Sequence, residues 1–141
     1  MIAAAAGEIP FSHKRHAALK LRCVACHPAA RKAERAGLPS VAECLSCHRA
    51  VLADRPLIRR LAGQPANATP FASAGRVRQA DFVFFSHARH TARVECDICH
   101  TGASGQESGP IAAPLTMKAC MDCHAATRAT LACNACHELG Q

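Results

Sequence analysis

The sequence has no Trp and no Tyr, and only five Phe among its 141 residues. Half of the residues are hydrophobic by type, but many of them are Ala, so the large side chains that usually fill a core are scarce. The length suits one domain, or at most two very small ones. A chain of this composition needs another source of buried apolar surface.

Long apolar runs are also missing. No stretch approaches the roughly 20 apolar residues of a membrane-spanning helix, so we expect no transmembrane segment and contact with a membrane only through a partner. The first seven residues, MIAAAAG, are too short for an export signal and lack its charged and apolar regions. They fit a remnant around an A-x-A cleavage site, or an added start.

Cysteine, in contrast, is abundant. The ten Cys fall without remainder into five copies of C-x-x-C-H, where random placement would give roughly 0.04 copies. The five motifs are Cys23/Cys26/His27, Cys44/Cys47/His48, Cys96/Cys99/His100, Cys120/Cys123/His124 and Cys133/Cys136/His137.

This spacing is typical of covalent haem attachment. Each Cys forms a thioether to a haem vinyl group, and the His that follows becomes the proximal ligand of the iron. The sequence therefore predicts five haem c groups, one for about 28 residues, which would supply most of the buried apolar surface. Zinc is the alternative for paired C-x-x-C, but it needs four ligands per site and does not explain a His after every second Cys.

The formal charge of +7 suggests an acidic partner or nucleic acid. Five haems would add about ten propionate charges, which five ferric irons offset in part, so the loaded protein lies near about +2 when oxidised and about −3 when reduced. We therefore expect the basic residues to balance propionates, and we expect no nucleic-acid partner.

A repeated segment divides the chain. F-S-H-x-x-H occurs at 11–16 and again at 85–90, each time shortly before a haem motif. We expect an N-terminal dihaem half (1–52), a connecting arm rich in Pro and Gly (53–80) and a C-terminal trihaem half (81–141). The predicted fold is mostly irregular, with short α-helices and little or no sheet, wrapped around five haems.

Local signals indicate short helices around the motifs. Ser40 with Glu43 forms a capping box, and Thr116 and Thr130 are candidate N-caps for the last two helices. Gly37 and Gly140 are candidate helix stops. The segment 81–85 (DFVFF) is either a short strand or an extended lead-in that places Phe against a haem face.

Four His remain after the five proximal ones, and all lie in the two F-S-H-x-x-H segments. They are His13, His16, His87 and His90. This confinement favours distal ligation of haem iron over scattered surface roles.

The order F-x-H-x-x-H, C-x-x-C-H, C-x-x-C-H resembles the small class III multihaem cytochromes, above all their trihaem members, over 11–48 and 82–137. In that family the first His ligates the haem attached next, and the second ligates the following haem. The resemblance implies four ligand pairs, which are His13 with His27, His16 with His48, His87 with His100, and His90 with His124.

No His is left for the haem at Cys133 and Cys136. Where the trihaem pattern has its third distal His, this sequence has Thr116, followed by Met117. A thioether is a good ligand for haem iron, so we expect Met117 to ligate this fifth iron, and the alternative is that Met117 only packs against a ring. The run L-x-M-x-x-C-x-x-C-H also resembles the pentahaem subunit of the alternative quinol-oxidising complex of some bacteria.

Irons with two protein ligands are closed to substrates, so the sequence predicts an electron conduit between redox partners, outside the cytoplasm, and no enzyme. Two alternatives stay open. One is a reductase that works at an open fifth iron. The other is a subunit of a cytochrome filament or of a membrane quinol complex.

Overall fold

The computed structural model describes residues 9–71, 79–107 and 116–138. Within these ranges the chain forms six short α-helices and four short 3-10 helices, no strand, and one isolated bridge between Val83 and His137. The predicted fold class is confirmed. The α-helices are α1 (His13–Ala18), α2 (Val41–His48), α3 (Pro56–Ala62), α4 (His87–Thr91), α5 (Cys96–Cys99) and α6 (Met117–Ala126). The 3-10 helices are η1 (Cys23–Ala25), η2 (Pro28–Arg31), η3 (Ala103–Gly105) and η4 (Cys133–Ala135).

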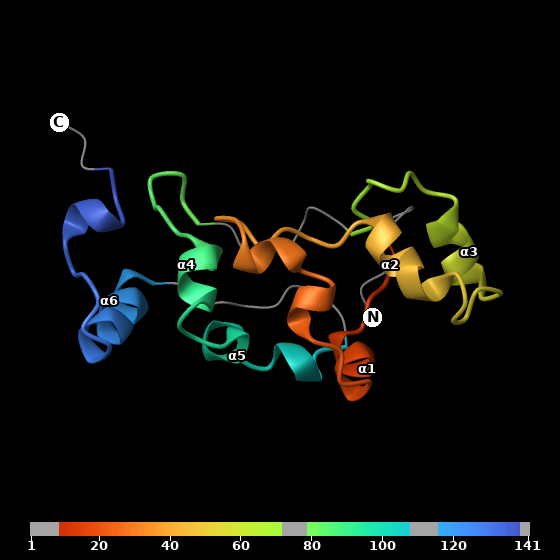
Figure 1. Cartoon of the computed structure of the whole chain (residues 1–141), viewed down its shortest axis with the longest axis horizontal. Coiled ribbons are helices and arrows are strands. Elements are labelled where there is room, and N and C mark those ends of the chain that lie inside the picture. The colour runs from red at the N-terminus through yellow and green to blue at the C-terminus, as the bar shows by residue number, and fades with distance from the viewer. Residues whose placement is uncertain (1–8, 72–78, 108–115, 139–141) are drawn as a thin grey trace.

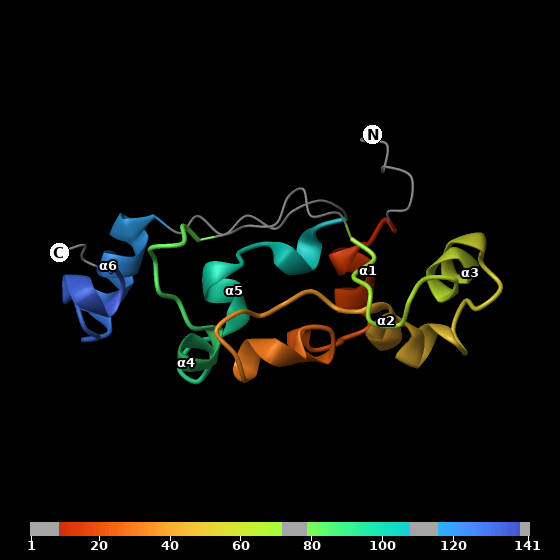
Figure 2. The same cartoon turned by 90° about the horizontal axis from the view of Figure 1, so that it is seen from above.

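These elements lie in a row along one long axis. In Figures 1 and 2, α6 occupies one end, α4 and α5 follow, and α2 and α3 form the other end. The chain does not run along this row in sequence order. The segment with η1 and η2 lies in the middle, against α4, and the chain then turns back to α2.

The side-chain core is small and lies at the α3 end. Val41 and Leu45 of α2 pack with Ile58 and Leu61 of α3, and Ile9 completes the cluster. Val41 has no exposed surface. A core of five residues is too small to hold a chain of 141 residues together, so most of the apolar contact must come from another group.

The helix α3 falls in the segment 53–80, for which the sequence predicted a connecting arm. Pro56 stands at its first position, where the missing N–H costs nothing. Its apolar face packs on α2. This part of the arm therefore packs as part of the fold.

The predicted caps have mixed outcomes. The capping box of Ser40 and Glu43 is confirmed, and the Thr116 hydroxyl accepts from the Ala119 N–H as an N-cap. Thr130 is not an N-cap, because η4 starts after Ala132, although the Thr130 hydroxyl accepts from the Ala132 N–H.

Gly37 ends no helix, since η2 stops at Arg31, but its left-handed φ of 69° does explain the glycine. Gly140 and the first seven residues lie outside the described residues. Among the residues that are described, no helix is long and apolar enough to cross a membrane.

Candidate functional site

The two F-S-H-x-x-H segments adopt one conformation. Ser12 and Ser86 are the N-caps of α1 and α4, and each hydroxyl accepts from the backbone N–H three residues on. Phe11 stacks on His16 at 4.4 Å and 25°, and Phe85 stacks on His90 at 4.3 Å and 23°. The first His of each segment stands edge-on to the same Phe. The Phe ring thus fixes both imidazoles, which explains why this residue belongs to the motif.

Three imidazoles of these segments face the imidazole of a C-x-x-C-H motif. The ring centroids are 6.2 Å apart for His16 and His48. They are 6.4 Å apart for His87 and His100, and 6.1 Å apart for His90 and His124.

These distances fit one iron between each pair. A metal–nitrogen bond of about 2.0 Å, with the ring centroid about 1.1 Å behind the nitrogen, separates two opposite imidazoles by about 6.2 Å. Rings in direct contact would lie closer, as each Phe–His stack does. The geometry therefore suits pairs of imidazoles that would each hold one haem iron between them.

The fourth predicted pair, His13 and His27, interacts electrostatically. Burial lowers the pKa of His13, and the nearby imidazoles of His27 and His16 lower it further. Burial likewise lowers the pKa of His100, followed by the effect of His87 and then of His27. Lowered pKa values favour the neutral imidazole, which is the form that binds iron. The imidazole of His27 contributes to the lowered pKa of both His13 and His100.

Backbone carbonyls orient six of the nine imidazoles through Nδ1, at 2.7 to 3.0 Å. The pairs are His16 with Ser12, His27 with Gly37, His48 with Val51, His87 with Glu34, His90 with Ser86, and His124 with Thr130. A carbonyl only accepts, so Nδ1 carries the proton and Nε2 is left for a metal.

Sequence reasoning missed these partners, because a carbonyl is the same in every residue. Gly37 and Thr130 were singled out for other roles and serve here through the backbone. Only the left-handed glycine offered a signal, since a positive φ at Gly37 turns its carbonyl back toward His27.

None of the ten Cys forms a disulfide, and those of successive motifs act on one another electrostatically within each half. Burial raises the pKa of Cys26, and Glu43 and Cys47 raise it further. Burial also raises the pKa of Cys99, with Cys123 and Cys120 adding to it. The attachment sites of neighbouring motifs therefore adjoin, as expected for closely spaced haems.

The His of the last motif has a different environment. The Nδ1 atom of His137 is buried and has no hydrogen-bond partner within the described part of the chain. The segment 81–85 runs beside this motif, with Phe84 N–H donating to the Cys136 carbonyl at 2.8 Å and the Phe82 ring 5.9 Å from the His137 ring. The segment turns at 81–82 and makes a single bridge at Val83, so it is not the short strand, and the placement of a Phe against a haem face stays a prediction.

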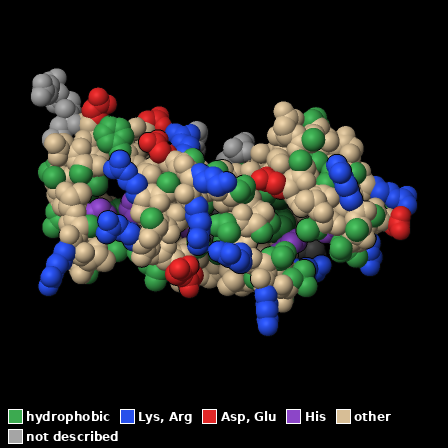
Figure 3. All heavy atoms as spheres, in the orientation of Figure 1, with side chains coloured by type: hydrophobic (Ala, Val, Ile, Leu, Met, Phe, Trp, Pro, Cys, Tyr) green, Lys and Arg blue, Asp and Glu red, His purple; other side chains and the backbone are tan. Residues whose placement is uncertain are grey.

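Met117 is the first residue of α6, and the residue is 62 % exposed. It is therefore not held in a side-chain core. The visible imidazoles in Figure 3 lie recessed below the surface, while Lys and Arg side chains are spread over this face.

Comparison with known proteins agrees with this geometry. The family described as "Cytochrome c7 and related cytochrome c" matches residues 83–138. The multiheme cytochrome c subunit of menaquinone reductase from Nitratidesulfovibrio vulgaris (strain Hildenborough) is 30% identical over 165 aligned residues, which cover 92% of this chain and 76% of the relative. The chain belongs to the class III multihaem cytochromes c.

The predicted resemblance is thereby confirmed, and this cytochrome binds haem c covalently. The match to the cytochrome c7 family covers the second F-S-H-x-x-H segment and the three motifs after it. The chemistry of this family is one-electron transfer, and the paired imidazoles in the described part of the chain are consistent with that chemistry.

Proposed function

We propose that this cytochrome is a pentahaem electron relay that works in the periplasm or outside the cell. The observation that carries the proposal is the set of imidazole pairs at 6.1 to 6.4 Å. An iron held by two imidazoles has no place for a substrate, so it passes electrons and does not activate bound molecules. The protein orients the ligands and brings the attachment sites together.

The division into a dihaem half (1–52), an arm (53–80) and a trihaem half (81–141) belongs to this proposal. The repeated conformation of α1 and α4 supports the two halves. The proposed iron ligands are the five motif His, the four His of the F-S-H-x-x-H segments in the predicted pairs, and Met117.

The haem count gives the first prediction. The intact mass of the mature protein should exceed that of the polypeptide by five haem masses, and no thiol should react with an alkylating reagent, since all ten Cys become thioethers. Mass spectrometry before and after alkylation measures both. Four haems or fewer, or one reactive thiol pair, would refute the count.

The fifth iron gives the second prediction. If Met117 ligates it, the oxidised protein should show the weak red sulfur-to-iron absorption band of His/Met haems, and this haem should have the highest reduction potential, because a Met ligand raises it. Met117→His should remove the band and lower one potential.

Met121 lies in the same helix and serves as the matched control, since Met121→Leu should leave the band in place. If the band persists in Met117→Ala, the assignment is wrong. If the unmodified protein has no such band and its reduced form binds carbon monoxide, the fifth iron is open, and a reductase becomes the better proposal.

The relative is named as a subunit of a menaquinone reductase, which favours a second candidate for the partner. On this view the relay is a subunit of a membrane complex that exchanges electrons with quinol. Co-purification of tagged protein from its own membranes, with quinol oxidation as the assay, separates this candidate from a free carrier or a filament.

A further inference from the structure

The two halves contact each other reciprocally. The Lys14 N–H of α1 donates to the Gln106 carbonyl at 2.9 Å, and the Ala88 N–H of α4 donates to the Ala33 carbonyl at 3.0 Å. Lys14 and Ala88 occupy the same place in the two F-S-H-x-x-H segments. Their acceptors also correspond, because each lies six residues after the His of a first motif.

The next residues, Glu34 and Glu107, also contact the helix of the other half, but through different groups. The backbone carbonyl of Glu34 accepts from both the backbone N–H and the Nδ1 of His87, at 3.0 and 2.9 Å. The side-chain carboxylate of Glu107 accepts from the Ser12 hydroxyl at 2.9 Å and pairs with Lys14 at 3.4 Å. Each half thus places its His-bearing helix against the segment that follows the first motif of the other half.

Such reciprocity is the mark of a two-fold interface, in which residue i meets j and j meets i. We call this contact the two-fold seam. It comprises α1 against Gln106 and Glu107, α4 against Ala30, Ala33 and Glu34, and Cys23 against Cys96.

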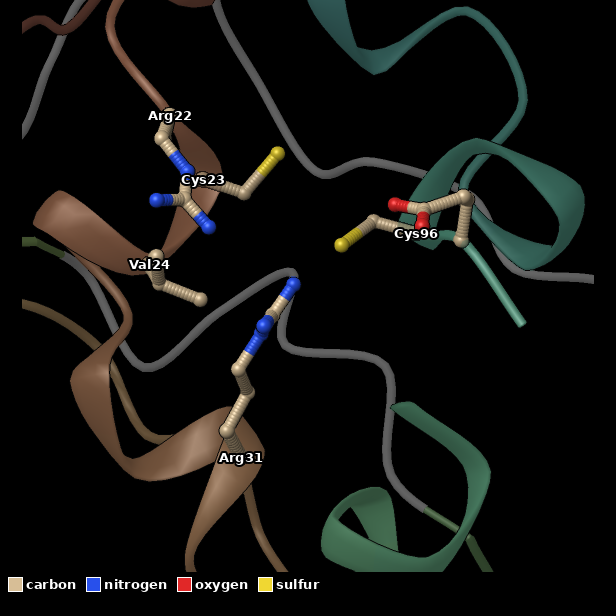
Figure 4. Close-up of a pocket in the computed structure, with 6 residues that line it drawn as sticks. Arg22, Cys23, Val24, Arg31 and Cys96 are labelled. Carbon is tan, nitrogen blue, oxygen red and sulfur yellow. The ribbon is translucent and has the colours of Figure 1, made fainter. Parts of the chain in front are cut away.

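A residue that lies on a two-fold axis contacts the equivalent residue of the other half. Cys23 faces its equivalent, Cys96, in this way. Cys23 and Cys96 are the first Cys of the first motif in each half. Figure 4 shows their sulfur atoms directed toward one another across a cavity of about 270 Å³ that both halves line. The Cys23 thiol is close enough to raise the pKa of Cys96 beyond the effect of burial.

We propose that the haem held by Cys23 and Cys26 adjoins the haem held by Cys96 and Cys99 at the two-fold seam, through their thioether edges. Electrons cross between the two halves at this contact. This inference rests on the proposed function as an electron relay. The seam places the first and third motifs at the centre. The second motif, on α2, lies on the outer side of the first, and the fourth, on α6, lies beyond the third (Figures 1 and 2).

The order of motifs along the relay is therefore second, first and third, followed by the fourth and fifth, which lie together at the α6 end. Electrons enter or leave at the second motif and at the α6 end, which are at opposite ends of the molecule. The order of the motifs along the sequence does not give this spatial order.

Proton NMR of the fully reduced holoprotein tests this arrangement, because low-spin ferrous haems are diamagnetic. We expect cross-relaxation peaks between the thioether protons at Cys23 and those at Cys96, and none between those at Cys44 and those at Cys96 or Cys120. Peaks that join the second motif to the third would overturn the order. A protein with five haems but without the Cys23–Cys96 peaks would overturn the seam and leave the relay intact, whereas loss of either haem would overturn both.

A matched pair of variants tests the seam in the same holoprotein. The Thr91 hydroxyl donates across the seam to the Ala30 carbonyl at 3.1 Å, while the Thr127 hydroxyl donates within its own helix to the Cys123 carbonyl at 2.8 Å. Thr91→Val should speed hydrogen exchange of the Lys14 and Ala88 amides about five-fold, the effect of one hydrogen bond. Thr127→Val should not change it. Equal rates in the two variants would mean that these contacts do not hold the halves together.

Discussion

His90→Ala should open one iron to carbon monoxide, and that iron should belong to the haem of Cys120 and Cys123. The His90 and His124 rings lie 6.1 Å apart, so removal of the first leaves the second without its partner across the iron. The reduced variant should bind carbon monoxide at about one haem in five more than the unmodified protein does. Soret titration measures the stoichiometry, and added imidazole should restore the original spectrum.

The identity of the opened haem decides whether the helix serves two different rings. The thioether proton resonances at Cys120 and Cys123 should move in His90→Ala, and those at Cys96 and Cys99 should move in His87→Ala. Arg89→Ala is the control, because this exposed residue lies between the two proposed ligands on α4. If His90→Ala moves the resonances of the Cys96 haem instead, the pairing taken from the trihaem family is wrong.

Leu61→Ala should lower the free energy of unfolding by about 3 kcal/mol. Leu61 is only 2% exposed and packs on α2 in the five-residue cluster, and removal of such a side chain leaves a cavity that costs about 2–5 kcal/mol. Urea titration followed by circular dichroism measures the change, and an unchanged slope shows that the transition is the same.

The matched control lies two residues away on the same helix. Arg59 pairs with Asp54 at 3.4 Å, but both side chains are exposed, and an exposed ion pair contributes less than about 1 kcal/mol. Arg59→Ala should therefore leave the unfolding midpoint nearly unchanged. Equal midpoints for the two variants would show that the cluster does not stabilise this end of the molecule.

The sequence predicted the parts of the site that depend on side-chain identity. Each Cys and proximal His follows from C-x-x-C-H, and the fold class follows from the lack of large core residues. The spare His were found because they occur in one repeated segment. Their pairing needed the resemblance to a family, since spacing along the chain does not say which motif a helix will face.

The features that the sequence did not predict depend on long-range contacts or on backbone groups. Helix α3 is stabilised by α2 through Ile58 and Leu61, and neither residue signals its partner. The carbonyls that orient the imidazoles have no residue signature. The two-fold seam depends on both long-range contacts and backbone groups. The sequence shows that the two halves are related, but it does not show which backbone groups meet between them.

One hydrogen bond at the two-fold seam both holds the two halves together and orients a proposed iron ligand. The carbonyl of Glu34, in the first half, orients His87, a proposed iron ligand in the second half. A force that pulls the halves apart would break this bond, and an imidazole that loses such an acceptor becomes a weaker electron donor to its metal. The potential of the third haem would rise at the moment when its distance from the first haem grows. Tension on the two-fold seam would therefore change two quantities together. These are the distance between the first and third haems and the driving force for electron transfer between them.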